Sequence, residues 1–192
     1  MNKDILGSFF NRILPLFPPR TEAVLKGMTT STLEDMNFRY IFTVDGMVTI
    51  SHIIEEMINK NKGVADLHVS FQYFSRFADQ EERYREVADH ATGLWLYGVD
   101  DAPLPALPRL TAVNTKDTPL ENYWFVIAYG PGVSATLLAE EITPDHRLDN
   151  EPRMYEGFYT FESDTGYQIL MLMHQMFPNQ VPLPVAPEKL RS

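Results

Sequence analysis

The chain has 192 residues, of which 44% are hydrophobic and 22% charged, so it is long enough to fold as one domain with a substantial core. Its 26 acidic residues against 16 Lys and Arg give a formal net charge of -10, which repels phosphate backbones and argues against nucleic-acid binding. The sequence contains no cysteine, which excludes disulfides and thiol chemistry and agrees with a reducing compartment. We therefore expect a cytoplasmic protein.

The first predicted element is an amphipathic helix over residues 4–14. Large apolar residues recur there at helical spacing, and Pro15 ends the pattern. No apolar run approaches the roughly 18 residues that a membrane span needs. An apolar helical face is usually covered by the helix's own domain or by a second protein. Binding at a membrane surface is the third alternative, which the shortage of Lys and Arg on the polar face disfavours. We expect residues 1–45 to form an N-terminal helical arm that supports a homo-oligomer or another partner interface. The candidate interface residues are Ile5, Phe9, Phe10 and Ile13.

The next elements are a short strand over residues 39–44 and a helix over 50–60. The pair Asp45-Gly46 between them predicts a turn or a small hairpin. In the helix, apolar residues follow the i, i+3, i+4 pattern, and Gly63 suits the position just after the end of a helix.

The middle of the chain predicts a strand–helix–strand unit. Residues 67–71 alternate between apolar and polar as in a strand, and a helix is expected from Asp79 to Gly93, with its apolar positions on one side. Residues 94–99 form a short apolar run that is typical of a buried strand. This order predicts parallel strand pairing.

The C-terminal half predicts antiparallel strands and one last helix. Residues 123–129 and 133–142 flank Gly130-Pro131-Gly132, which indicates a hairpin. A strand is expected at 155–161. The helix after it, from Ser163 to Phe177, has almost no polar face and should be buried or covered by a partner.

The expected fold class is α/β: a single domain, residues 46–178, with a mixed sheet of about five to six strands flanked by helices. Residues 179–192 should form an extended Pro-rich tail.

The sequence gives little support for catalysis. It lacks a phosphate-binding loop, a dinucleotide fingerprint and a GxSxG nucleophile motif. Its five histidines show no metal-ligand spacing, so we predict neither a metal nor a cofactor. A hydrolase that uses Asp100, Asp101 or Glu141 as its acids is the weakest of the hypotheses.

Aromatic residues with a few polar companions mark a candidate ligand site. The residues are Phe74, Arg76, Trp95 and Trp124. Phe74 and Arg76 follow a predicted strand directly, and ligands of α/β sheets bind at the carboxyl ends of strands. Plain core packing is the alternative explanation for the aromatic side chains.

Several segments in order resemble the DICT sensory domain, over about residues 50–177. These segments are residues 71–77 (FQYFSRF), 83–88 (RYREVA), 97–99 (YGV), 103–105 (PLP), 119–125, 130–141 and 155–161 (YEGFYTF). That family occurs largely in cyanobacterial signalling proteins, attached to diguanylate cyclase, histidine kinase or response regulator parts.

The resemblance implies a non-catalytic sensory or regulatory module of signal transduction. Because no output domain follows in this sequence, we expect it to signal in trans to a histidine kinase, a response regulator or a diguanylate cyclase. A small molecule is one expected stimulus. The alternative is a ligand-free dimeric adaptor or scaffold that docks on a kinase, a response regulator or another protein complex.

Overall fold

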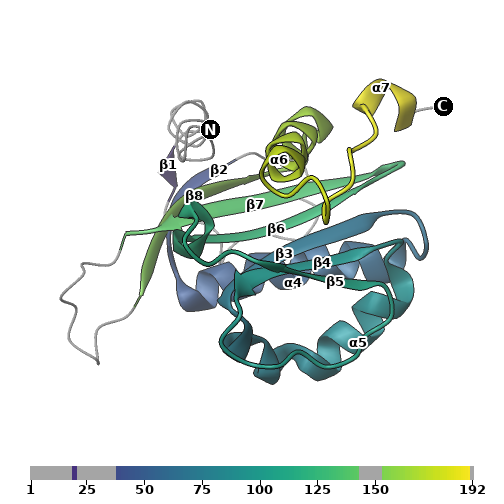
Figure 1. Ribbon diagram of the computed structural model, residues 1–192. Coiled ribbons are helices and arrows are strands. Elements are labelled where there is room, and N and C mark those ends of the chain that lie inside the picture. The colour runs from purple at the N-terminus through teal and green to yellow at the C-terminus, as the bar shows by residue number, and fades with distance from the viewer. Residues whose placement is uncertain (1–18, 21–37, 143–152, 191–192) are drawn as a thin grey trace.

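An eight-stranded mixed sheet organises the chain in the computed structural model, which describes residues 19–20, 38–142 and 153–190. The strand order is β1-β2-β8-β7-β6-β3-β4-β5, with helices on both faces (Figure 1). The strands are β1 (Pro19–Arg20), β2 (Phe38–Thr43), β3 (Asp66–Tyr73), β4 (Leu94–Val99), β5 (Leu110–Asn114), β6 (Tyr123–Gly130), β7 (Val133–Glu141) and β8 (Met154–Thr160). The expected mixed α/β fold is confirmed. The sheet is larger than the predicted five to six strands. Strand β2 confirms the short strand predicted over residues 39–44, and β1 adds an edge strand from a segment that was expected to be helical.

The sheet combines two kinds of strand pairing. Strands β3, β4 and β5 run parallel to one another, as the strand–helix–strand pattern predicted. Strands β6, β7 and β8 form antiparallel neighbours, and β6 and β7 meet in the predicted hairpin, where Gly130 pairs with Val133. Strand β3 pairs with β4 in parallel and with β6 in antiparallel orientation, so the sheet changes from parallel to antiparallel pairing at β3.

Helix α4 (Val44–Lys60) begins earlier than predicted, and the expected turn or hairpin at Asp45-Gly46 is wrong. The hydroxyl of Thr43 caps the helix by accepting a hydrogen bond from the Gly46 amide at 3.4 Å. Asp45 in the first turn favours the helix dipole. Because Met47 is buried, packing against the sheet extends the helix through a pair that locally favours a turn.

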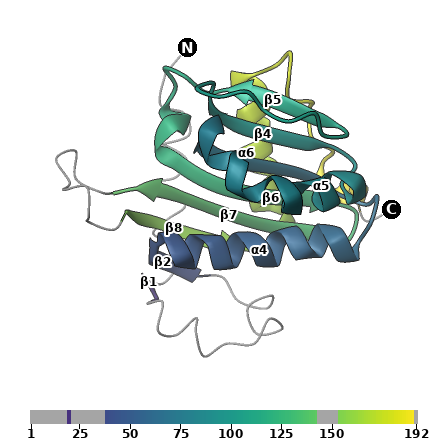
Figure 2. The ribbon, with the colours of Figure 1, turned by 90° about the horizontal axis from the view of Figure 1, so that it is seen from below.

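One face of the sheet is covered by α4, by the 3-10 helix η2 (Phe74–Gln80) and by α5 (Glu81–His90). Figure 2 shows α4 and α5 on this face, and the two helices contact each other. The α-helix expected from Asp79 starts two residues later, at Glu81, because the 3-10 helix η2 extends to Gln80. Phe74 and Phe77 are both buried, and a helix with three residues per turn places such a pair on the same side.

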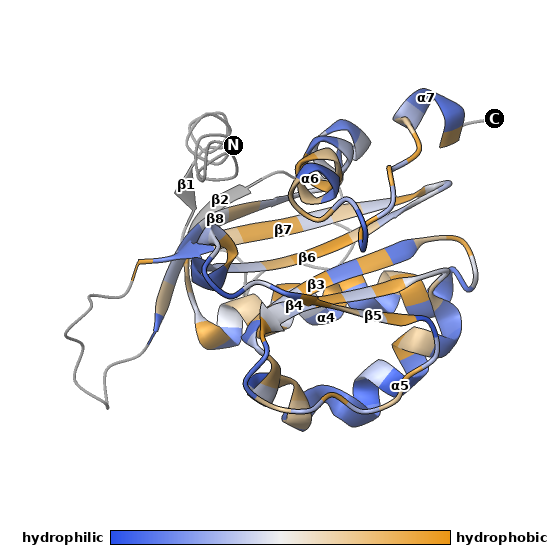
Figure 3. Ribbon diagram, in the orientation of Figure 1, coloured by the Kyte–Doolittle hydropathy of each residue, from blue (hydrophilic) through white to orange (hydrophobic). Residues whose placement is uncertain are grey.

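The other face is covered by α6 (Ser163–Met176) and the residues after it. The predicted burial of this apolar helix holds for one face: Ile169 and Met173 are buried against the sheet, whereas Met171, Leu172 and Met176 are half-buried. The indole of Trp95 then donates to the Gln180 carbonyl at 2.9 Å, and the chain continues to the short helix α7 (Pro187–Leu190). Figure 3 shows hydrophobic residues along the strands, whereas α5 is largely hydrophilic. The sheet therefore separates two apolar layers.

The predicted helix over residues 4–14 lies outside the described residues, together with Ile5, Phe9, Phe10 and Ile13. Among the helices that the structure does describe, none is both long enough and apolar enough to cross a membrane.

Candidate functional site

A cavity of about 200 Å³ lies between α4 and the sheet, on the face that also carries α5. Its residues come from α4, from β3 and β6, from η2 and the start of α5, and from the residue before β8. They are Val44, Val48, Ser51, His52, Glu55, Val69, Phe71, Arg76, Asp79, Gln80, Tyr84, Trp124 and Arg153. The cavity thus has an apolar floor formed by the sheet and a charged rim.

The structure brings two of the four predicted ligand-binding residues together here. Arg76 and Trp124 both line the cavity. Arg76 extends from η2 just after β3, as its place in the sequence suggested. Trp124 projects from β6 and meets the ring of Tyr155 edge-on, with ring centroids 5.6 Å apart.

The other two residues lie elsewhere. Phe74 is buried in the core, and a Cβ atom built on Gly98 would come within 2.9 Å of its ring. Trp95 packs on the opposite face of the sheet, where its indole stacks on His68 with ring centroids 4.4 Å apart. For Phe74 and Trp95, therefore, core packing is a better explanation than a ligand site. Trp95 is separated from the cavity by the sheet, and Phe74 is separated from it by turning into the core from η2.

At the cavity rim lies a polar network centred on Gln72, which the sequence did not single out. Gln72 is buried in β3 and has a positive φ of 64°, at the point where the register between β3 and β4 shifts. This irregularity turns the side chain toward the ends of β6, β7 and β8. Its amide nitrogen donates to the Glu121 carbonyl at 3.1 Å and to Glu141 Oε2 at 3.0 Å. Both partners are pure acceptors, which fixes the orientation of the amide.

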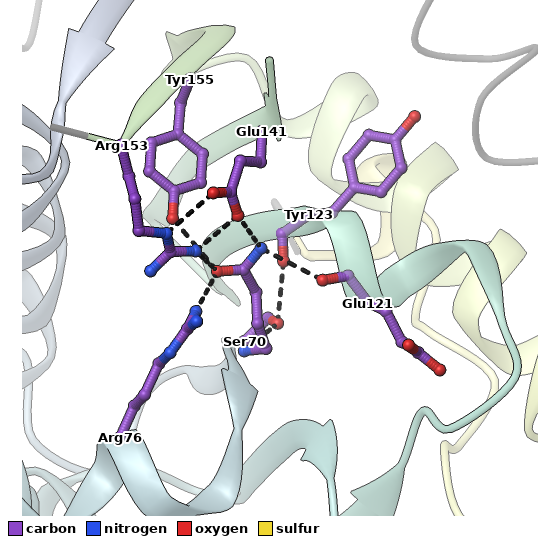
Figure 4. A network of polar contacts seen from close by, with 8 residues as sticks. Ser70, Arg76, Glu121, Tyr123, Glu141, Arg153 and Tyr155 are labelled. Atoms are coloured by element: carbon purple, nitrogen blue, oxygen red, sulfur yellow. Dashed lines mark hydrogen bonds and ion pairs between the residues drawn. The ribbon is translucent and has the colours of Figure 1, made fainter. Parts of the chain in front are cut away.

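Three donors converge on the other end of that amide. Gln72 Oε1 accepts hydrogen bonds from Arg76 Nη1, from Arg153 Nη2 and from the Tyr155 hydroxyl, the last at 3.1 Å. Figure 4 shows Arg76 and Arg153 reaching toward this point from different elements, with Glu141 and Tyr155 beside them. One buried glutamine therefore joins η2, β7 and β8.

Glu141 is held as a carboxylate. Arg153 donates from Nε to Oε1 at 2.8 Å and from Nη2 to Oε2. Burial alone would raise the pKa of Glu141, but the hydrogen bonds from Arg153 and Gln72 and the positive charges of Arg153 and Arg76 outweigh it and lower the pKa to about 2. For Arg153, burial opposes the charged form, yet the hydrogen bond with Glu141 raises the pKa.

A second buried charge forms the α4 side of the cavity. Glu55 is 2% exposed and accepts from the Tyr84 hydroxyl at 2.6 Å and from Arg83 Nε. Arg83 also donates to the His52 carbonyl at 3.1 Å. Burial, and then the charge of Glu55, raise the pKa of Tyr84 well above its ordinary value. This cluster ties α4 to α5 at the wall of the cavity.

Of the three acids in the hydrolase hypothesis, two make contacts within the fold and the third is exposed. Asp101 accepts from the Ser75 amide at 2.9 Å and from the Ser75 hydroxyl at 2.6 Å, which anchors the start of η2. Glu141 belongs to the ion pair with Arg153, and Asp100 is exposed. Within residues 38–142 and 153–190, no group of three or more His, Asp or Glu side chains is arranged to hold a metal ion.

Sequence reasoning missed Gln72, Arg153 and Glu55. Arg153 follows a polar stretch and precedes β8, and nothing in its local sequence indicates a partner in β7. The pair Glu55 and Arg83 lies 28 residues apart in the chain. Only the charge of Glu55 on an otherwise apolar helical stripe could have indicated a buried partner.

A comparison with known protein families finds one match for this chain. A model of the DICT family, described as "Sensory domain in DIguanylate Cyclases and Two-component system", matches residues 24–142. This match confirms the family expected from the sequence, although it begins and ends earlier than the expected range of about 50–177. No curated protein matches the chain.

Two solved structures are similar to the chain. Polyphosphate kinase from Porphyromonas gingivalis superposes with a TM-score of 0.56 at 7% identity, over 88% of this chain. The match spans 30% of that kinase, and at such low identity it concerns the fold alone. NucT from Helicobacter pylori gives a TM-score of 0.41 at 8% identity, over 76% of this chain and 99% of NucT, which is too low to support a conclusion.

Proposed function

This chain belongs to the DICT family of sensory domains, and from that premise we propose that it is a non-catalytic signalling module that binds a small molecule in the cavity beneath β3 and β6. The observation that carries the proposal is the cavity itself. Within about 200 Å³, an indole and two guanidinium groups face a common space that has an apolar floor and a polar rim. Binding sites of this kind combine an apolar lining with a few placed polar groups.

A relay to a partner follows from where α4 lies. The N-terminal half of the helix lines the cavity, and Val44 directly follows the last residue of β2. A ligand that binds two positions of α4 with different affinity would shift the population between them. The shift would act on β2 and its neighbour β8. We propose that this side of the sheet signals in trans to a histidine kinase, a response regulator or a diguanylate cyclase.

Fluorescence of Trp124 tests ligand binding. The chain has two tryptophans, so in a Trp95→Phe variant of the full chain Trp124 is the remaining fluorophore. We expect at least one compound of a metabolite panel to shift its emission and to raise the melting temperature. A flat response in both measurements across the panel contradicts the ligand-binding function and leaves the adaptor as the better hypothesis.

A matched pair of variants separates the cavity from other surfaces. Val48 lines the cavity, whereas Val185 is 51% exposed on the C-terminal segment. Val48→Phe should fill the cavity and abolish the response to any compound found in the screen. Val185→Phe adds the same volume and should leave the response intact. Equal behaviour of the two variants would place the binding site elsewhere.

A further inference from the structure

We propose that the ligand of this cavity carries an anionic group, a carboxylate or a phosphate, and that Arg76 is the residue that binds it. The inference rests on the proposed function, because it names the chemistry of the ligand for the same cavity. It is carried by the arrangement of charges around Gln72.

Among the side chains that the structure describes, positive charge exceeds negative charge on the network side of the cavity. Arg76 and Arg153 contribute two guanidinium groups, and Glu141 contributes the carboxylate that binds Arg153 through both of its oxygens. Arg76 makes no ion pair with another side chain that the structure describes. Its hydrogen bond goes to a neutral amide oxygen. Arg76 is therefore the cation with binding capacity left over.

The acids on the opposite side do not neutralise Arg76. Glu55 is engaged by Arg83 and Tyr84, as described above. Asp79 also lines the cavity, but it too forms no ion pair with Arg76 among the described side chains. Partial burial and the neighbouring charge of Arg153 lower the pKa of Arg76 by more than the carboxylate of Glu141 raises it. An entering anion would remove that penalty.

The acceptor that Arg76 uses is crowded. A carbonyl oxygen offers two lone pairs, yet Gln72 Oε1 receives three donors, of which two are cationic. Arg153 remains tied to Glu141, and Tyr155 is buried in β8. Arg76 lies at the exposed rim, with its guanidinium 4.7 Å from the centre of the Tyr73 ring. Arg76 can therefore leave Gln72 for a ligand while the rest of the network stays satisfied.

The remaining walls define the rest of the ligand. Trp124, Phe71 and Val48 form an apolar surface next to Arg76. The volume of about 200 Å³ is below the roughly 300–1,000 Å³ that is typical of sites for drug-sized ligands. The cavity therefore fits a compact anion with a small apolar or planar body, and a cyclic dinucleotide is too large to fit inside it.

Three probes test the inference on the full-length Trp95→Phe chain, by calorimetry and by Trp124 emission. Benzoate supplies a carboxylate on a planar body, benzamide is its neutral counterpart, and inorganic phosphate supplies the other anion. We expect benzoate or phosphate to bind, and benzamide to bind at least about tenfold more weakly, as befits the loss of a charged hydrogen bond. Whether benzoate or phosphate binds tells carboxylate from phosphate recognition.

Substitution of Arg76 gives the matched test. Arg76→Gln should raise the Kd of the binding anion about tenfold or more, and Arg76→Lys should restore part of the affinity, since Lys keeps the charge without the planar fork. Arg85→Gln removes an exposed cation of α5 that pairs with Glu81, and it should leave the Kd unchanged.

Each outcome decides the proposal. Benzamide binding as tightly as the anions, or an unchanged Kd in Arg76→Gln, overturns the anion site and leaves the cavity as a ligand site. Failure of all three probes also overturns it, and the metabolite panel with the Val48→Phe variant then decides separately whether the cavity binds a ligand at all.

Discussion

Arg153 binds the carboxylate of Glu141 through two nitrogens, Nε and Nη2, and thereby joins the start of β8 to the end of β7. The two side chains are 16% and 22% exposed, so the pair is only partly screened by water. Charged hydrogen bonds of this bidentate kind are stronger than neutral ones. The pair therefore contributes to the stability of the sheet at the rim of the cavity.

Glu141→Gln should destabilise the fold by about 1–2 kcal/mol at pH 7, because it leaves a partly buried guanidinium without its counter-ion. The effect depends on pH. Since the folded-state pKa of Glu141 is about 2, below its ordinary value of 4.5, the stabilisation is complete above about pH 4.5 and is lost as the pH falls toward 2. Urea unfolding of the wild type and the variant should converge in that window. Glu86→Gln, at an exposed position of α5, is the control.

His68 should produce acid destabilisation in a different window. It is buried between Trp95 and Tyr97, and burial lowers its pKa from 6.5 to about 3. Below pH 6.5 the imidazole of His68 is protonated in the unfolded chain but stays neutral in the folded chain. Stability is therefore expected to fall by about 1.4 kcal/mol per pH unit from pH 6.5 toward 3. His68→Gln should flatten this slope, and His90→Gln should not. The same slope in wild type and His68→Gln would contradict the prediction.

Two variants of Gln72 separate its side chain from its backbone. Gln72→Ala should cost about 2–4 kcal/mol, because Arg76, Arg153 and Tyr155 lose their common acceptor. Gln72→Gly removes the same side chain, but glycine adopts the positive φ of 64° without strain. It should therefore be more stable than the Ala variant by about 0.5–1 kcal/mol. Thermal unfolding of both variants measures the difference, and a Gly variant less stable than Ala would contradict it.

Gly157 should tolerate no side chain. A Cβ atom there would overlap the carbonyl oxygen of Leu138 and the backbone of Ala139 on the neighbouring strand β7. Gly157→Ala should therefore cost about 3 kcal/mol or more, since strand backbone cannot move aside cheaply. Gly132 is the control: its Cβ would meet nothing within 4 Å, and only its φ of 71° opposes a side chain. Gly132→Ala should cost about 1–2 kcal/mol in the same denaturation assay.

The N-terminal segment remains a proposed interface. If the apolar face of residues 4–14 joins two copies of the chain, the double substitution Phe9→Asp and Phe10→Asp should lower the mass measured by light scattering to that of a monomer. The expected cause is the burial cost of two carboxylates in an apolar contact. Asn11→Asp adds a charge beside that face and should leave the mass unchanged. An unaltered mass in the double variant would exclude these residues from a homo-oligomer contact.

Periodicity determined most of the secondary structure. The apolar run of residues 94–99 and the Gly-Pro-Gly turn between β6 and β7 were recognisable because strand and hairpin patterns depend on neighbours in the sequence. The turn predicted at Asp45-Gly46 was wrong because it too depended only on neighbours in the sequence. Its local preference for a turn was overridden by the cap from Thr43 and by burial of Met47, and such tertiary packing routinely outweighs local propensity.

The sequence by itself determined the fold class, the family, and the position of Arg76 just after a strand. Only the tertiary structure decided that Arg76 and Trp124 share a cavity while Trp95 and Phe74 do not. The reason is physical. Trp95 lies on the opposite face of the sheet from the cavity, whereas Phe74 turns into the core from η2. The partners of a buried charge, such as Gln72 for Arg153 at a separation of 81 residues, are brought together by sheet order, which no local pattern encodes.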